Sequence, residues 1–273
     1  MELNGKVAII TGGASGIGSA TWQKLADENV KAIGVVDQTD NVEIVCSEAN
    51  ARLGRELLVP FRGDVVDSSF RERVFGEMEN RFGPVSLCIP AAGIIRDRLS
   101  VKVHRNNGWV TPSIYSETDF RRVIDVDLIA PIYWAMRTVG SVAVDRSKRG
   151  LKEWRPEESV QGAIILIGSI SSAGNRGQIS YATAKAGLEG AQGTLAKEAI
   201  YYGVRCAIIH PGFTDTPMVR ALGEDMIQEQ ILPHTQLHRL IRPDEIAGAI
   251  VFMLKNSAVS GTLWADAGWH PTA

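Results

Sequence analysis

Residues 164–203 read IILIGSISSAGNRGQISYATAKAGLEGAQGTLAKEAIYYG and form the most informative stretch of the sequence. Its apolar start predicts a buried strand, and a Gly/Ser/Asn-rich turn then leads into an alanine-rich helix. Tyr181 and Lys185 lie four residues apart in that helix, so one helical turn places both side chains on the same face. Ser169 and Ser171 follow the strand, at the edge where open parallel sheets carry their functional groups. A hydroxyl, a phenol and an ammonium at one sheet edge form a set of groups for proton transfer.

A Tyr-x-x-x-Lys pair occurs by chance in many helices, so this interpretation requires a hydride carrier elsewhere in the chain. The apolar run 6–10 is followed by TGGASGIG at 11–18 and then by an amphipathic helix. The spacing is G-x-x-x-G-x-G rather than the standard G-x-G-x-x-G, but strand, glycine-rich turn and helix form the context of a dinucleotide site. Glycines permit close backbone approach, and the free N–H groups of the helix start bind a pyrophosphate. The predicted cofactor-binding residues of this loop are Gly12, Ser15, Gly16, Ile17 and Gly18.

Asp37 follows the second predicted strand, 31–36, and lies nineteen residues after Gly18. An acidic residue at this place accepts hydrogen bonds from the adenosine ribose hydroxyls. Its carboxylate repels a 2′-phosphate, and no Arg or Lys stands at Ser15 or just after Asp37 to bind one. The sequence therefore favours NAD over NADP. The alternative is that Asp37 is an ordinary polar residue at a strand end and binds no cofactor.

Further strands and helices alternate along the chain. A helix is expected over 42–53, a strand over 57–61, a helix with an apolar stripe over 70–82, and a strand over 85–89. After residues 164–203 we expect a strand at 204–209, a helix at 242–254 and a last strand at 261–266. The loops that follow these strands supply further predicted cofactor contacts: Asp64, Val65, Ala91, Ala92, Gly93, Pro211, Gly212, Thr214 and Thr216. This order predicts an α/β fold, a doubly wound parallel sheet with helices on both faces, in one domain over 1–273.

Asp127 falls on the buried stripe of a predicted helix over 119–139. A lone buried carboxylate is costly, so it requires partners or a function. Pro131 has no N–H, which leaves the Asp127 carbonyl without its helical partner and free for an ordered water that leads toward Lys185. The alternative is a proline kink beside a structural, hydrogen-bonded aspartate.

Three stretches interrupt the regular alternation. Residues 96–117 and 141–161 are long for connections and are predicted to be inserted loops, the second of them a solvated charged surface. Residues of about 213–240 have few strong core signals and are predicted to form a flap over a substrate pocket. Trp109, Trp269 and this flap are expected to determine the substrate.

Composition limits the remaining possibilities. Of 273 residues, 45% are hydrophobic and 22% charged, which is typical of a soluble chain with a substantial core. A net charge of −2 gives no electrostatic reason to expect nucleic acid or a membrane as partner. The three cysteines predict structural thiols in a reducing cytosol, and the histidines form no metal-binding pattern, so no metal site is expected. With neither a signal peptide nor a membrane span in evidence, the sequence predicts a cytoplasmic protein.

Taken together, these residues resemble the short-chain dehydrogenase/reductase family over nearly the whole chain. The resemblance rests on seven ordered motifs or positions: TGGASGIG (11–18), Asp37, Asp64, AAG (91–93), the set of Ser169 with Tyr181-x-x-x-Lys185, PG (211–212) with Thr216, and DAG (266–268). It implies a seven-stranded Rossmann sheet, a nicotinamide cofactor, and a homotetramer or homodimer packed through helices around Asp127 and after Tyr181.

The resemblance also implies roles for the catalytic set. Tyr181 would be the acid/base, Lys185 would lower its pKa and bind the nicotinamide ribose, and Ser169 would orient the substrate. Three positions depart from the family pattern. The usual Asn in the central helix is Asp127, which we expect to alter the pH profile, and the usual Asn-Ala-Gly reads Ala91-Ala92-Gly93. Ser169 also precedes Tyr181 by one residue fewer than is common, so Ser171 is an alternative for its role.

Three functions remain in competition. The first is an NAD(H)-dependent oxidoreductase that interconverts a secondary alcohol and a ketone. The second is reduction of a 3-oxoacyl thioester, because AAGIIRD and GNRGQISYATAKAG resemble carrier-protein reductases, although Asp37 argues against the NADP that these generally prefer. The third is a non-catalytic NAD(H)-binding sensor, favoured only by Asp127 and Ala91.

Overall fold

The computed structural model describes residues 1–106 and 109–269. Within them, seven parallel strands form one sheet in the order β3-β2-β1-β4-β7-β8-β9. The strands are β1 (Val7–Thr11), β2 (Ala32–Asp37), β3 (Leu58–Arg62), β4 (Val85–Pro90), β7 (Gly162–Ile167), β8 (Val204–Pro211) and β9 (Thr262–Ala265). The strand order reverses between β1 and β4, which opens a crevice at their carboxyl ends. The predicted Rossmann-type α/β fold is confirmed, with strand ends within two residues of those expected.

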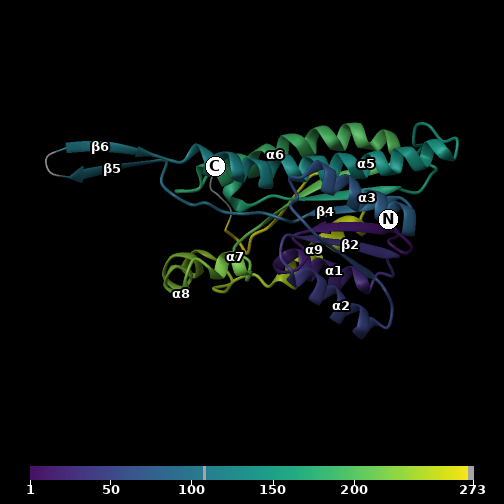
Figure 1. The fold of residues 1–273 in the computed structure, drawn as a ribbon, viewed down its shortest axis with the longest axis horizontal. Helices are drawn as coiled ribbons and strands as arrows, with labels where there is room; N and C mark the ends of the chain where they lie inside the picture. Colours follow the sequence, from purple (N-terminus) through teal and green to yellow (C-terminus); the bar gives the residue numbers. More distant parts are fainter. Residues whose placement is uncertain (107–108, 270–273) are drawn as a thin grey trace.

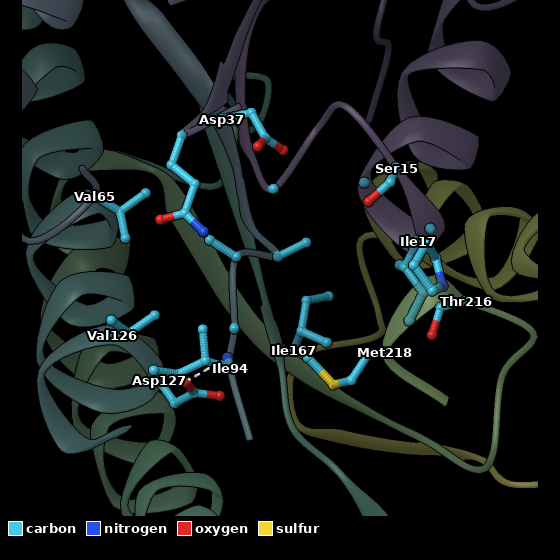
Figure 2. A pocket seen from close by; sticks show the side chains of 18 of the residues that line it. Ser15, Ile17, Asp37, Val65, Ile94, Val126, Asp127, Ile167, Thr216 and Met218 are labelled. Atoms are coloured by element: carbon cyan, nitrogen blue, oxygen red, sulfur yellow. Dashed lines mark hydrogen bonds between the residues drawn. The ribbon is translucent and has the colours of Figure 1, made fainter. Parts of the chain in front are cut away.

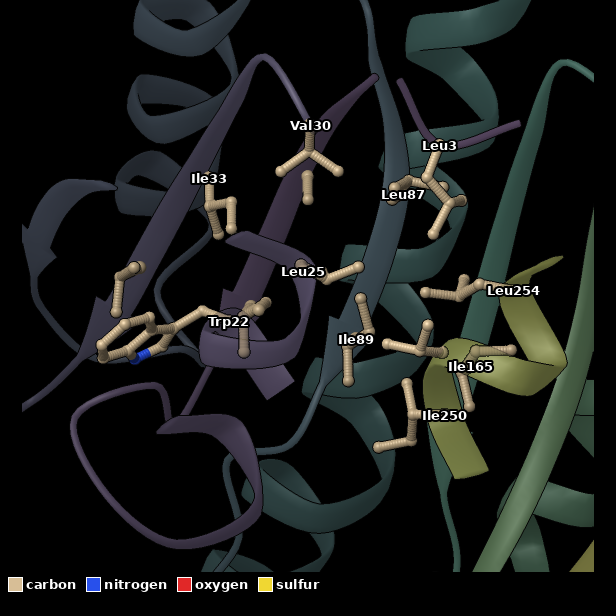
Figure 3. Close-up of a cluster of buried hydrophobic side chains, with 14 of the residues drawn as sticks. Leu3, Trp22, Leu25, Val30, Ile33, Leu87, Ile89, Ile165, Ile250 and Leu254 are labelled. Carbon is tan, nitrogen blue, oxygen red and sulfur yellow. The ribbon is translucent and has the colours of Figure 1, made fainter. Parts of the chain in front are cut away.

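Helices cover both faces of the sheet (Figure 1). One face carries α1 (Gly16–Ala26), α2 (Asn41–Leu53) and α9 (Pro243–Lys255), and the other carries α3 (Ser68–Phe82), α5 (Ala130–Lys148) and α6 (Ile179–Glu198). Strand side chains alternate between the two cores: Ile165 packs in the first and Ile164 in the second. Figure 3 shows the first core, in which Trp22 and Leu25 of α1 lie with strand residues and with Ile250 of α9. The doubly wound arrangement is therefore a consequence of two-residue periodicity in apolar strands.

The helix expected over 119–139 is present but is not uniform. It begins as α4 (Glu117–Ile124), passes through a π-helical turn at Asp125–Ile129, and continues as α5. The Ala130 N–H bonds to the carbonyl of Asp125, five residues back. Because Pro131 cannot donate to Asp127, the wider turn accommodates the proline within a continuous helical segment.

The stretch predicted as a loop over 96–117 contains an antiparallel hairpin instead. Strands β5 (Val101–Asn106) and β6 (Trp109–Ile114) pair with each other and project from the body of the molecule (Figure 1). All twelve strand residues are exposed. The alternation of Val101 and Val103 with polar residues is a strand pattern, but no core covers its apolar face within the described chain.

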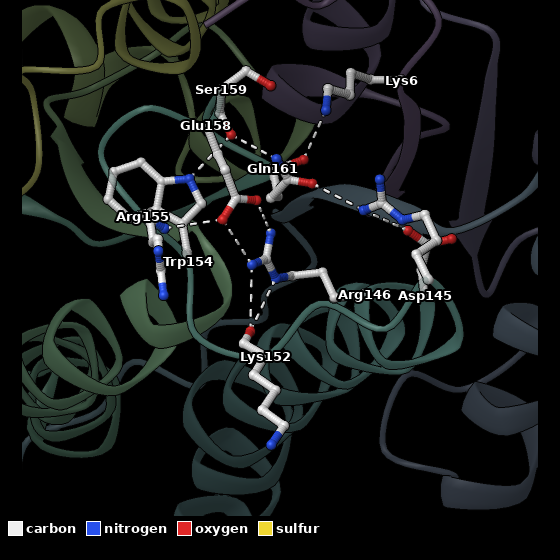
Figure 4. Close-up of polar contacts among 10 residues, drawn as sticks. Lys6, Asp145, Arg146, Lys152, Trp154, Arg155, Glu158, Ser159 and Gln161 are labelled. Carbon is white, nitrogen blue, oxygen red and sulfur yellow. Dashed lines mark hydrogen bonds and ion pairs between the residues drawn. The ribbon is translucent and has the colours of Figure 1, made fainter.

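The prediction of an inserted loop over 141–161 is wrong for its first third, where α5 continues to Lys148. Val142 and Arg146 are buried one and two turns beyond Thr138, so the buried face of the helix continues past residue 141. It was not recognised in the sequence because it includes polar residues such as Thr138 and Arg146. The remainder is irregular and is held by Arg146, which binds both carboxylate oxygens of Glu158 and the carbonyl of Lys152 (Figure 4). These contacts tie the segment to the body of the protein.

The region predicted as a flap over 213–240 folds into short helical pieces around a small apolar cluster. The pieces are α7 (Pro217–Arg220), α8 (Glu224–Met226), a π-helical turn (Ile227–Ile231) and a 3-10 turn (Leu232–His234). Ile227 and Ile231 pack there with Leu240. In the main cores Cys46, Cys88 and Cys206 are buried free thiols, as predicted. Among the described residues, no helix has the length and apolar character needed to cross a membrane.

Candidate active site

A cleft of about 320 Å³ opens at the carboxyl ends of β1, β2 and β4 (Figure 2). It brings together fifteen of the predicted site residues: Gly12, Ser15, Gly16, Ile17, Gly18, Asp37, Asp64, Val65, Ala91, Ala92, Gly93, Asp127, Tyr181, Lys185 and Thr216. Pro211, Gly212 and Thr214 line a separate, smaller pocket next to it. Segments from Gly12 to Thr216 in the chain thus meet at the crevice where the strand order reverses.

The glycine loop has the geometry of a phosphate cradle. Gly12 has φ +65°, and a Cβ atom there would lie 2.8 Å from the Cα of Ala92. A Cβ atom at Gly18 would lie 2.3 Å from the carbonyl oxygen of Gly12. Ser15 precedes α1 without capping it through its side chain, so its hydroxyl and the positive end of the helix remain available to a ligand. These features fit the pyrophosphate of a dinucleotide.

Two acidic side chains lie further along the cleft. The Asp37 carboxylate accepts hydrogen bonds from the Ala14 N–H and from the N–H and hydroxyl of Thr39, which fix its position at the end of β2. Asp64 pairs with Arg122 of α4, with Oδ2 and Nη2 3.0 Å apart. Sequence reasoning missed Arg122, because nothing in its local pattern distinguishes it from the other surface arginines of its helix.

Tyr181 and Lys185 share one face of α6, as predicted. The Lys185 ammonium lies 5.4 Å from the centre of the Tyr181 ring and donates to the Ile167 carbonyl at 3.1 Å. It also lies 3.4 Å from Oδ2 of Asp127, whose side chain is fully buried. The other Asp127 oxygen accepts from the Ile94 N–H at 2.9 Å (Figure 2). Asp127 therefore meets the lysine directly through its carboxylate, whereas the sequence suggested a link through its main-chain carbonyl.

This arrangement changes the acid–base balance expected of the site. Burial raises the pKa of Tyr181; Lys185 opposes this effect, while the negative charge of Asp127 adds to it. As predicted, Lys185 lowers the pKa of Tyr181, but burial and the negative charge of Asp127 together raise it by more, so the net pKa lies above its ordinary value. Burial also raises the pKa of Asp127 and disfavours the Lys185 cation, but their mutual attraction raises the pKa of Lys185. This mutual attraction favours the pair of carboxylate and ammonium.

The smaller pocket, about 120 Å³, shares part of its lining with the cleft. Tyr181 lines both cavities, together with Ile17, Ile167, Thr216 and Met218. The rest of the lining of the smaller pocket is mostly apolar and includes Phe213 and Leu222 from the region predicted as a flap. Trp109 lies on the exposed hairpin and lines neither cavity, which contradicts its expected part in substrate selection.

The structure distinguishes the two candidate serines. Ser169 forms a hydrogen bond that lowers the pKa of Tyr181, and its Oγ accepts from the Ser171 N–H at 3.0 Å. The Ser171 hydroxyl instead donates to the side chain of Gln178 at 2.7 Å. Gln178 in turn donates to Asp97 at 2.7 Å. Ser169 is therefore the serine placed beside the tyrosine, and Ser171 belongs to a polar chain at the pocket wall.

Comparison with known proteins agrees with this geometry. The sequence model of the short chain dehydrogenase family matches residues 6–227, and the chain belongs to that family. Its members are oxidoreductases that act on CH–OH and keto groups with nicotinamide cofactors.

Several curated relatives match over almost their full length. The 3-oxoacyl-acyl-carrier-protein reductase FabG of Escherichia coli is 29% identical, over 94% of this chain and 93% of its own. The protein of the same name from Thermotoga maritima is 30% identical, over 94% of both chains. The acetoacetyl-CoA reductase of Synechocystis is 31% identical, over 100% of this chain and 99% of its own.

Proposed function

We propose that this protein is an NAD(H)-dependent oxidoreductase that interconverts a secondary alcohol and a ketone. The observation that carries the proposal is the position of Tyr181, which lines both the dinucleotide cleft and the apolar pocket. A ketone in the apolar pocket whose carbonyl carbon faces a nicotinamide in the cleft would have its carbonyl oxygen at the junction of the two cavities. Tyr181 is the proton donor at that junction.

Tyr181, Ser169 and Lys185 have separate roles in the proposed reaction. In reduction, the Tyr181 phenol gives its proton to the carbonyl oxygen, and the Ser169 hydroxyl orients that oxygen by a second hydrogen bond. Lys185 stabilises the resulting phenolate and, because it also lines the cleft, would hold a ribose hydroxyl of the cofactor. When bound, the nicotinamide supplies or accepts the hydride. The apolar lining of the smaller pocket supports a ketone of modest size.

The choice of NAD rests on Asp37. Its carboxylate lines the cleft and would lie against the adenosine ribose, where a 2′-phosphate would be repelled. Asp37→Ala should therefore narrow the ratio of the NADPH and NADH dissociation constants by at least about tenfold. An unchanged ratio would mean that another residue selects the cofactor.

A second candidate substrate is a 3-oxoacyl thioester. It is favoured by the relatives, which are named as reductases of 3-oxoacyl-acyl-carrier-protein and of acetoacetyl-CoA. The same residues would perform that reaction, because its reacting group is also a ketone.

The test begins with fluorescence titration of the purified protein with NADH and with NADPH, followed by NADH-oxidation assays on simple ketones and on acetoacetyl-CoA. Tyr181→Phe is the matched control, since it removes only the hydroxyl. It should abolish turnover and leave NADH affinity within about twofold. Turnover by Tyr181→Phe would remove the tyrosine from the mechanism, and tight NADH binding without any turnover would favour the sensor.

A further inference from the structure

His210 is a fully buried histidine that the mechanism above does not use. It lies in β8, immediately before the Pro211–Gly212 turn, with its ring stacked on Trp264 of β9. The two ring centres are 4.3 Å apart and the planes are inclined by 19°. Histidine is not among the residues that favour strand interiors for packing alone, so the polar contacts of its ring are informative.

One ring nitrogen contacts the main chain of Ser169. Nδ1 of His210 lies 3.1 Å from the Ser169 nitrogen and 2.9 Å from the Ser169 carbonyl oxygen. An unprotonated Nδ1 accepts from the N–H and faces the carbonyl oxygen with its lone pair, whereas a protonated Nδ1 donates to the carbonyl and leaves the N–H without its acceptor. The protonation of Nδ1 therefore determines which group of the serine is held.

The other ring nitrogen faces a carboxylate. Nε2 lies 3.7 Å from Oε1 of Glu189 on α6 and has no hydrogen-bond partner among the described residues. That distance is too long for a hydrogen bond, but the negative charge favours a proton on Nε2. Burial, with a smaller contribution from Lys185 of α6, lowers the pKa of His210, although the contact with the Ser169 main chain and the charge of Glu189 oppose this, so the ring is neutral at pH 7. A further polar neighbour, the Ser172 hydroxyl, lies 3.4 Å from Nδ1.

The backbone beside the ring is adapted to this contact. A Cβ atom at Gly168 would lie 2.6 Å from two ring atoms of His210, so a glycine is required there for the ring to reach Ser169. Gly168 in turn donates to the Ile209 carbonyl at 2.7 Å, which holds the end of β7 against β8. His210 thus lies behind the residue whose hydroxyl faces Tyr181.

We propose that His210 is a positioning residue for the reaction: with its proton on Nε2, directed by Glu189, it accepts from the Ser169 N–H and holds the serine hydroxyl toward Tyr181. The kinetic part rests on the proposed ketone reduction, whereas the tautomer is independent of it. His210 touches neither cavity, so its effect is on geometry rather than on binding.

Two substitutions separate this role from packing. His210→Phe keeps a ring on Trp264 but leaves the buried Ser169 N–H without an acceptor, and we expect kcat to fall by at least about tenfold while NADH affinity stays within about twofold. His210→Asn offers an amide oxygen as acceptor and should retain kcat within about threefold. Both are measured on the best ketone of the panel, with thermal unfolding as the check on folding. Equal kcat for folded His210→Phe and wild type would overturn the proposal, as would an equal loss in both variants.

The tautomer is read directly by NMR of the protein labelled with 15N-histidine, with His210→Asn to assign the signal. We expect a neutral ring with the proton on Nε2 at pH 7, and a larger share of the Nδ1–H form in Glu189→Gln. A proton on Nδ1 in the wild type would overturn the assignment. This measurement needs no turnover, so it decides the contact even where every ketone fails and the proposed function is rejected.

Discussion

Replacing Asp127 with Asn tests the electrostatics of the active site most directly. The substitution removes a buried negative charge that lies 3.4 Å from Lys185, and the asparagine oxygen can still accept from the Ile94 N–H. Because Lys185 is 5.4 Å from the Tyr181 ring centre, the carboxylate lies within about 9 Å of that ring. At an effective dielectric constant of about 20, a unit charge at about 9 Å acts on a phenolate with about 2 kcal/mol.

The sign follows from the two charges near the phenol. Asp127 raises the pKa of Tyr181 and Lys185 lowers it, so removing the carboxylate leaves the lysine unopposed. The phenolate, which is the base in alcohol oxidation, then forms at lower pH. We expect the midpoint of the oxidation profile, kcat/KM against pH, to move to lower pH by about one unit.

The assay is NAD reduction with the best alcohol substrate from pH 6 to pH 10, for wild type, Asp127→Asn and Asp125→Asn. Asp125 lies in the same π-helical turn but makes no ion pair with Lys185, so its variant should match the wild type. A midpoint in Asp127→Asn that stays in place, or moves to higher pH, would refute the assignment of Asp127 as an ionised partner of Lys185.

Three further outcomes concern stability. Trp134 is fully buried, donates to the Val65 carbonyl and contacts Phe75, so Trp134→Ala should cost about 3–5 kcal/mol in urea unfolding; a cost below about 1 kcal/mol would contradict this packing. Arg239 and the Arg242 N–H hold the pKa of Glu245 at about 2, below its ordinary 4.5, so its contribution is complete above pH 4.5 and is lost as the pH falls to about 2. The difference in unfolding free energy between wild type and Glu245→Gln should shrink across that window, and a difference independent of pH would contradict the linkage. Replacing residues 101–114 with a short Gly-Ser turn should change Tm by less than about 2 °C, because the described hairpin residues are exposed; a fall of more than about 5 °C would show that the hairpin is covered in solution.

Local pattern accounts well for the fold and for the outline of the site. Apolar runs such as 164–167 form strands at nearly the expected residues, and the spacing of Tyr181 and Lys185 correctly places both on one helix face. The glycine loop and Asp37 also line one cleft, as the order of strand, turn and helix predicts. These features depend on neighbours in the chain, so periodicity and spacing are sufficient to reveal them.

Two errors in the predicted elements have different physical causes. Helix α5 runs past its predicted end because Arg146 satisfies its charge with Glu158, a partner twelve residues away that no periodicity reveals. Strands β5 and β6 were missed because they pair with each other and, within the described chain, pack against no core, so no buried stripe marks them in the sequence.

The sheet, the glycine-rich loop before α1 and the common helix face of Tyr181 and Lys185 could be predicted from the sequence, because each strand, turn or helix is encoded by residues close together in the chain. The contacts that place Ser169 rather than Ser171 beside Tyr181, and Asp127 beside Lys185, could not be predicted from local pattern. The tertiary structure also places His210 behind Ser169, forty-one residues earlier in the chain. The physical reason is that the direction of a buried polar side chain is set by the partner it finds across the sheet, and that partner comes from another strand or helix.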